Sequence, residues 1–187
     1  IQKGGRLSDQ SKDLIKKSGI NFSTKGDKLL AKSNNLPIDI LFVRDDDIPS
    51  LVSNGDADLA IVGENVLIEK TLFKKNNTVK VLDLGFSKCR LSIAAPDNKK
   101  NMRLANKKIA TSYPNILKKY LADNNINATV TNIHGSVELT PYIGMSDCIC
   151  DLVSSGATLE ANNLKEIKVI LNSQAVLIKN KKLSKNK

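Results

Sequence analysis

The sequence has no tryptophan, a single histidine and only three cysteines, and aromatic residues make up 4% of its 187 residues. Such a low aromatic content argues against a stacking platform for single-stranded nucleic acid. Because the cysteines form no C-x-x-C pair, we do not expect a structural zinc site, and we assign His134 a structural role. Cys148 and Cys150 alternate along an apolar stretch, a poor spacing for a disulfide, so we expect buried, reduced thiols.

Long apolar runs are absent as well. No segment approaches the roughly 18–20 apolar residues of a membrane-spanning helix. The opening residues, IQKGGRLSDQ, lack the charged-then-apolar order of a secretory signal. We therefore expect a cytoplasmic protein that has no membrane partner. Hydrophobic residues account for 41% of the chain, which is enough for a core in one compact unit or in two small lobes.

Arginine is scarce although the chain is basic. The formal net charge is +10, yet only four residues are arginine: Arg6, Arg44, Arg90 and Arg103. A protein that reads duplex nucleic acid usually relies on arginine for bidentate contacts with bases and phosphates. The lysines are scattered along the sequence, so we interpret the charge as a solvated surface and expect no nucleic-acid partner.

Strand-like and helical segments alternate in the first half of the chain. A strand-like segment, 36–44, leads into an acidic segment in which Pro49 suits the first turn of a helix and Gly55 suits its end. A buried strand over 56–63 then precedes a helix over 64–73. This order predicts an α/β lobe with a largely parallel sheet.

A second α/β series begins near residue 88. We therefore divide the chain into a first lobe (1–87), a second lobe (88–168), and a C-terminal segment (169–187) that returns to the first lobe and ends in a tail. In this second series we expect strands over 89–96, 128–136 and 147–153, a strand and loop over 108–114, and a final pair of strands over 167–180. We expect helices over 115–125 and 158–164 and a short helix over 138–144.

The stretch CICDLVSSGATLEANNL, residues 148–164, runs from a predicted strand through small and hydroxyl residues into a predicted helix. A phosphate monoester would suit the N–H and hydroxyl groups of this loop, and a helix start adds positive potential. Asp151, just before the loop, suits ribose hydroxyls or a magnesium ion. An ordinary capped connection has similar residues, and no G-K-[ST] of a P-loop follows. The candidate phosphate-binding residues are Ser154, Ser155, Gly156, Ala157 and Thr158.

Other junctions between predicted elements carry related chemistry. Glu138, in GSVELTP, either faces the same cleft as a second acid or only stabilises a helix start. Lys3 and Arg6 flank a Gly-Gly turn that suits a polyphosphate. Arg44 lies beside three acids, which local pairing explains equally well, and Tyr113 suits either base stacking or packing. Several of these junctions follow predicted parallel strands, at the sheet edge where open α/β proteins bind ligands.

Seven segments, in this order, resemble the catalytic region of ATP phosphoribosyltransferase, the enzyme that opens histidine biosynthesis. They are QKGGRL, RDDDIP, DADLAIVGENVL, CRLSIAAP, TSYP, GSVELTP and DLVSSGATLEANNL. The resemblance covers nearly the whole chain, and its most specific part is the last segment combined with GSVELTP. It implies a two-lobed α/β fold similar to type II periplasmic-binding proteins, with the active site in the cleft between the lobes.

The resemblance further implies a Mg²⁺-dependent glycosyltransferase. N1 of ATP would attack C1 of phosphoribosyl pyrophosphate (PRPP), pyrophosphate would leave, and phosphoribosyl-ATP would form. The loop from Ser154 to Thr158 would hold the 5-phosphate, while Asp151 and Glu138 would face the ribose hydroxyls and the magnesium. We assign no general base and expect catalysis by positioning and charge stabilisation. The residues implied on the ATP and polyphosphate side are Lys3, Arg6, Arg44, Glu64 and Tyr113.

The same two lobes could also form a module that binds a small anion without catalysing a reaction, because a fold does not determine a function. The family also implies a homo-oligomer, a dimer or larger. In RDDDIP, GENVL and Ala157 the chain is similar to the family's long form, whose C-terminal domain binds histidine. The sequence stops at Lys187, before such a domain, so we expect histidine not to inhibit this chain alone. The short form instead recruits a regulatory subunit similar to histidyl-tRNA synthetase.

Overall fold

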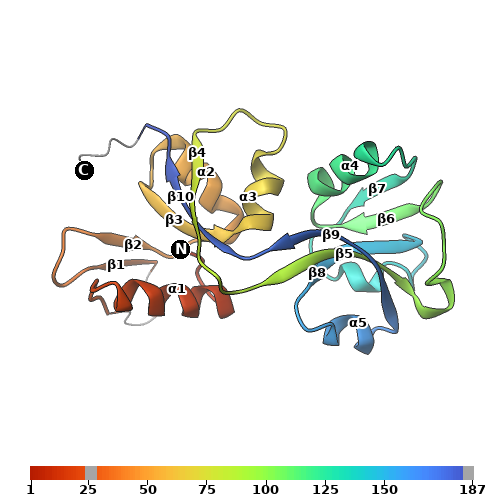
Figure 1. Ribbon diagram of the computed structural model, residues 1–187. Coiled ribbons are helices and arrows are strands. Elements are labelled where there is room, and N and C mark those ends of the chain that lie inside the picture. Colours follow the sequence, from red (N-terminus) through yellow and green to blue (C-terminus); the bar gives the residue numbers. More distant parts are fainter. Residues whose placement is uncertain (24–28, 183–187) are drawn as a thin grey trace. The chain divides into compact units, whose positions relative to one another are not determined.

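The computed structural model describes residues 1–23 and 29–182, which form two compact units (Figure 1). The first unit contains residues 1–87 and the returning segment from 174, and the second contains 88–173. The sequence pattern restarts at this first boundary. The second boundary differs from our expectation, because residues 169–173 complete strand β9 (Leu164–Ser173) of the second unit. Residues 183–187, expected as a tail, lie outside the described residues.

The larger sheet of the first unit does not have the parallel pairing that we predicted. Its strand order is β3-β10-β4, and β10 pairs antiparallel with both neighbours. Strands β3 and β4 do run in the same direction, as a strand–helix–strand order predicts, but the C-terminal strand is inserted between them. The elements of this sheet and its helices are α2 (Ile48–Asn54), β3 (Leu59–Gly63), α3 (Glu64–Thr71), β4 (Thr78–Asp83) and β10 (Ala175–Asn180).

The remaining part of the first unit is a helix with a small antiparallel sheet. Helix α1 (Arg6–Lys17) accompanies β1 (Leu30–Lys32) and β2 (Asp39–Leu41), which pair with each other. The predicted strand over 36–44 is thus only three residues long in β2. A short 3₁₀ helix, η1 (Asp45–Asp47), then leads into α2.

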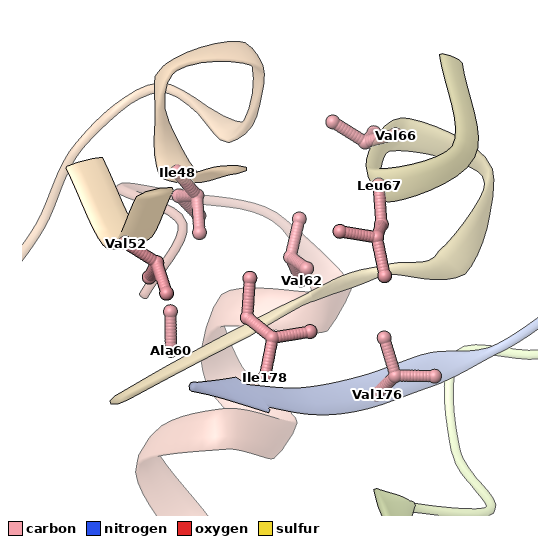
Figure 2. Packing of buried hydrophobic residues seen from close by; sticks show 8 residues of the cluster. All are labelled: Ile48, Val52, Ala60, Val62, Val66, Leu67, Val176 and Ile178. Atoms are coloured by element: carbon pink, nitrogen blue, oxygen red, sulfur yellow. The ribbon is translucent and has the colours of Figure 1, made fainter. Parts of the chain in front are cut away.

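Helices α2 and α3 pack their apolar side chains against β3 and β10 (Figure 2). The predicted signals for α2 are confirmed: Pro49 lies in its first turn, and Gly55 ends it in the left-handed conformation with φ 90°. Burial of this cluster removes apolar surface from water and stabilises the unit. The cluster consists of Ile48, Val52, Ala60, Val62, Val66, Leu67, Val176 and Ile178.

The second unit is built on a mixed sheet with the strand order β7-β6-β8-β5-β9. Strand β6 pairs parallel with β7 and β8, whereas β5 pairs antiparallel with β8 and β9. The carboxyl ends of the three parallel strands therefore meet at one edge. Besides β9, the elements are β5 (Cys89–Pro96), η2 (Asp97–Lys99), β6 (Lys108–Thr111), α4 (Pro114–Asp123), β7 (Thr129–Asn132), η3 (Val137–Leu139), β8 (Cys148–Val153) and α5 (Ala157–Ala161).

The cysteines are unbridged, as expected. Cys148 and Cys150 are buried in β8, and burial raises the pKa of the Cys148 thiol to about 12. Such thiols behave as small apolar side chains of the core. None of the helices in the described part of the chain combines the length and apolar character needed to cross a membrane.

Candidate functional site

Three loops of the second unit meet at the carboxyl edge of its parallel strands. Tyr113 follows β6, Glu138 follows β7 within η3, and the loop from Ser154 follows β8. The prediction that these junctions share one sheet edge is therefore right for this unit. In α/β sheets this edge is the usual position of ligand sites, because loops of adjacent parallel strands converge there.

A small hollow of about 140 Å³ lies at this edge. All seven residues that we predicted for PRPP take part in its lining, and Tyr113, although at the same edge, does not. The lining includes two carboxylates and no lysine or arginine among the described residues. The predicted residues in the lining are Glu138, Asp151, Ser154, Ser155, Gly156, Ala157 and Thr158.

The loop after β8 presents its backbone rather than bulky side chains. Gly156 has φ 93° and ψ −8°, a left-handed conformation that favours glycine, and its missing Cβ would meet nothing within 4 Å. The Ser155 hydroxyl accepts a hydrogen bond from the Ala157 amide at 3.3 Å. Helix α5 has only five residues, so its dipole adds less positive potential than we expected. Amide and hydroxyl groups are therefore the main donors of this loop.

Asp151 lies half-buried in β8, two residues before the strand ends, and lines the same hollow as these donors. Burial raises the pKa of its carboxyl, and the nearby negative charge of Glu138 raises it further. The Leu152 amide donates a hydrogen bond to Asp151 Oδ1 at 2.8 Å, which opposes the rise. A partly desolvated carboxylate with a second acid nearby is a strong acceptor for hydroxyl donors and a suitable ligand for a cation.

The raised pKa of Asp151 has a predictable effect on stability. The folded protein binds this proton more tightly than the unfolded chain, so Asp151 stabilises the fold least at neutral pH and more as pH falls below the raised pKa. We expect Asp151→Asn to unfold at a higher temperature than the wild type at pH 7. The difference should shrink as the pH is lowered towards 3.8, the ordinary pKa of aspartate. Calorimetric melting in EDTA measures it, and exposed Asp13→Asn controls for net charge. A difference that is independent of pH would contradict the assignment.

Four of the predicted ATP-side residues belong to the first unit. Lys3 and Arg44 are brought close to each other, because the Lys3 amide donates to the Val43 carbonyl at 2.7 Å. Lys3, Arg6 and Arg44 are exposed. Glu64 begins α3, where the predicted helix over 64–73 starts, and its carboxylate accepts a hydrogen bond from Lys80 Nζ at 2.8 Å. Their roles towards ATP remain predictions.

Arg90 is a residue near the hollow that we did not predict. Its Nε donates to Glu166 Oε2 at 2.7 Å, and its Nη1 donates to the Ser154 carbonyl at 3.4 Å. The second contact ties the start of the loop to β5. Arg90 stands in CRLSIAAP, one of the segments that carry the family resemblance, but its contact with the loop depends on the pairing of β5 with β8.

A larger hollow, of about 440 Å³, lies at the opposite edge of the same sheet. It is lined by residues 97–102 with Lys107 and Asp147, which precede β6 and β8. The Asp147 carboxylate accepts a hydrogen bond from the Lys108 amide at 2.9 Å, so this acid fastens the strand starts. The chemistry that distinguishes the carboxyl edge, small hydroxyl residues beside two acids, is not found in this lining.

Fold comparison identifies the structural class first. A probable amino-acid ABC transporter extracellular-binding protein, YtmK from Bacillus subtilis, superimposes with a TM-score of 0.56 at 14% identity, covering 96% of this chain and 75% of that chain. This likeness concerns the fold alone. The chain has the two-lobed α/β fold of type II periplasmic-binding proteins, as the family resemblance implied.

Sequence comparison identifies the family. The HisG family, described as ATP phosphoribosyltransferase, matches residues 44–187. An ATP phosphoribosyltransferase of Cytophaga hutchinsonii is 52% identical over the whole of this chain, which spans 65% of that relative's length. A structure of the ATP phosphoribosyl transferase (HisG:HisZ) complex from Thermotoga maritima matches with a TM-score of 0.80 at 28% identity, covering 94% of this chain and 84% of that chain. The chain belongs to the ATP phosphoribosyltransferase family.

Proposed function

We propose that this chain transfers the phosphoribosyl group of PRPP to N1 of ATP. The N1–C1 bond forms as the bond from C1 to the pyrophosphate oxygen breaks, and pyrophosphate leaves with the bonding electron pair, giving phosphoribosyl-ATP with inversion at C1. The observation that carries the proposal is the hollow of the second unit, in which two acids lie beside a loop of amide and hydroxyl donors, in a chain of this family. The reaction would open histidine biosynthesis.

The residues of the hollow divide into two chemical roles. The loop from Ser154 to Thr158 offers amide and hydroxyl donors to the 5-phosphate of PRPP. Asp151 and Glu138 accept hydrogen bonds from the ribose hydroxyls. They do not contact the phosphate directly, because the two negative charges would repel each other. Fixing the ribose in this way aligns C1 with the incoming N1, and such positioning supplies a large part of the rate. We place Lys3, Arg6, Arg44, Glu64 and Tyr113 on the ATP and polyphosphate side.

The acids of the hollow also fit a magnesium ion that arrives with PRPP. Among residues 1–23 and 29–182, no three His, Cys, Asp or Glu side chains are grouped to hold a metal ion by themselves. Magnesium is usually bound by one or two carboxylates together with substrate phosphates, and Asp151 and Glu138 provide such a pair. When bound, the ion would neutralise charge on the leaving pyrophosphate.

A regulatory subunit is a further proposed partner. The Thermotoga maritima relative is found in a HisG:HisZ complex, and it shares the fold of this chain at a TM-score of 0.80. Size-exclusion chromatography of this chain, alone and mixed with a HisZ protein, tests both this partner and the proposed homo-oligomer. Elution of the two proteins at their separate positions would contradict the partner.

Isothermal titration calorimetry with PRPP and Mg²⁺ tests the binding half of the proposed function. We expect saturable binding that inorganic phosphate weakens by competition, because phosphate occupies the loop that holds the 5-phosphate. Omitting Mg²⁺ should reduce the affinity if Asp151 and Glu138 share the ion with the substrate. Absence of PRPP binding under all of these conditions would overturn the proposed function.

A further inference from the structure

A buried hydroxyl lies beside the candidate PRPP site without a hydrogen-bond partner. Ser92, in β5, is 1% exposed, and its Oγ is one of two buried side-chain polar atoms in the described residues that make no hydrogen bond. The other is Ser8 Oγ, in α1 of the first unit. Buried hydroxyls are nearly always paired, so an unpaired one next to a ligand site indicates a partner that comes into hydrogen-bonding position only when the ligand binds.

The strand register places Ser92 directly opposite Asp151. Strands β5 and β8 pair antiparallel, with Ser92 facing Asp151 and Arg90 facing Val153. Opposed residues of an antiparallel pair project to the same face, with Cβ atoms about 4.5–5.5 Å apart. Rotation about the Cα–Cβ bond of serine is therefore enough to bring its hydroxyl within hydrogen-bonding reach of the Asp151 carboxylate.

Arg90, which forms an ion pair with Glu166, projects from the same face of β5 as Ser92, because alternate residues of a strand share a face. Glu166, in β9, lies opposite Ala94 of β5. The Arg90 side chain therefore extends along β5, past position 92, to reach the Glu166 carboxylate. The same arginine holds the Ser154 carbonyl at 3.4 Å. Ser92 thus shares a face of the sheet with Asp151 and with the arginine that holds the Ser154 carbonyl.

We propose that Ser92 is a positioning residue for Asp151: its hydroxyl donates a hydrogen bond to the carboxylate and holds it towards the ribose hydroxyls of PRPP. In the free protein the Leu152 amide donates a hydrogen bond to Asp151 Oδ1. The hydrogen bond from Ser92 forms when the ribose fixes the carboxylate. This role rests on the proposed function, because it requires PRPP at the hollow.

Ser92→Ala tests the proposal by separating binding from stability. The hydroxyl is unpaired in the free protein, so its loss should leave the melting temperature without PRPP unchanged or higher. The Kd for PRPP should rise roughly tenfold, the loss expected for one hydrogen bond to a charged group. The increase in melting temperature that saturating PRPP produces should become smaller. Ser8→Ala, which removes the other unpaired hydroxyl, should change neither quantity by a comparable amount.

A double-mutant cycle shows whether Ser92 acts through Asp151. In an Asp151→Asn background, Ser92→Ala should change the Kd by less than about twofold, because coupled residues give non-additive effects. If the wild type binds PRPP and Ser92→Ala binds it equally well, the role of Ser92 is wrong and the proposed function stands. An equal loss in both backgrounds, with a lower melting temperature of the free variant, would show a structural role only. If the wild type binds no PRPP, both proposals fall.

Discussion

Asp151→Ala should lower kcat/KM for PRPP roughly 100-fold to 1000-fold, because it removes hydrogen bonds to the ribose that are worth about 1.5–3 kcal/mol each to a charged acceptor. The free protein should not be destabilised by the change. Burial already raises the pKa of this carboxyl, which means that the charged form is disfavoured by the fold. Initial rates over a range of PRPP concentrations, together with calorimetric melting, measure both effects.

Asp147→Ala is the matched control for this prediction. Asp147 precedes the same strand, β8, and is also half-buried, but it lines the hollow at the opposite edge of the sheet. Its carboxylate accepts a hydrogen bond from the Lys108 backbone amide. Removing the carboxylate should therefore lower the stability of the fold and leave the PRPP kinetics nearly unchanged. Equal kinetic losses in the two variants would show that the carboxyl edge has no special role.

Gly156→Val should weaken PRPP binding by roughly 5-fold to 150-fold if the loop after β8 presents its backbone to the 5-phosphate. The strained residue costs about 1–3 kcal/mol, and the loop would relieve this strain by moving the amides that bind the phosphate. Gly156 has φ 93°, a conformation in which a β-branched residue is strained. Its surroundings are open to 4 Å, so the strain arises in the backbone rather than from a clash. Calorimetric titration with PRPP measures the loss.

Gly19→Val separates strain from ligand binding. Gly19 has φ 83° and equally open surroundings, but it follows α1 in the first unit. Both variants should melt at a lower temperature, and only Gly156→Val should lose affinity. Gly156→Asn should retain more affinity than the valine variant, because asparagine tolerates the left-handed conformation. Normal PRPP binding by Gly156→Val would show that the loop does not cradle the phosphate.

The local elements were predictable where proline and glycine mark the start and the end of a helix. Pro49 and Gly55 mark the first turn and the end of α2, and the structure confirms both. The antiparallel sheet of the first unit was not predictable from local pattern. Its central strand, β10, comes from residues 175–180 and pairs with β3 at 59–63. Pairing across such a separation depends on tertiary packing, which neither propensity nor periodicity encodes.

The candidate site shows the same division between local and distant information. The acids and the small-residue loop were predictable because their chemistry is visible within GSVELTP and DLVSSGATLE, and the parallel strands bring them together at one edge. Arg90 and Ser92 were not, because their relation to Ser154 and Asp151 depends on the β5–β8 register. A serine in an apolar strand looks like any other core residue until its cross-strand partner is known.

Formation of phosphoribosyl-ATP is the measurement that tests the proposed function most directly. The chain is incubated with ATP, PRPP and Mg²⁺, with pyrophosphatase to remove the released pyrophosphate, and the product is separated by chromatography. We predict product that depends on both substrates, that is nearly lost in Asp151→Ala and that persists in Asp147→Ala. Saturable PRPP binding without any product would contradict the proposed transfer reaction and would identify the chain as a module that binds a small anion.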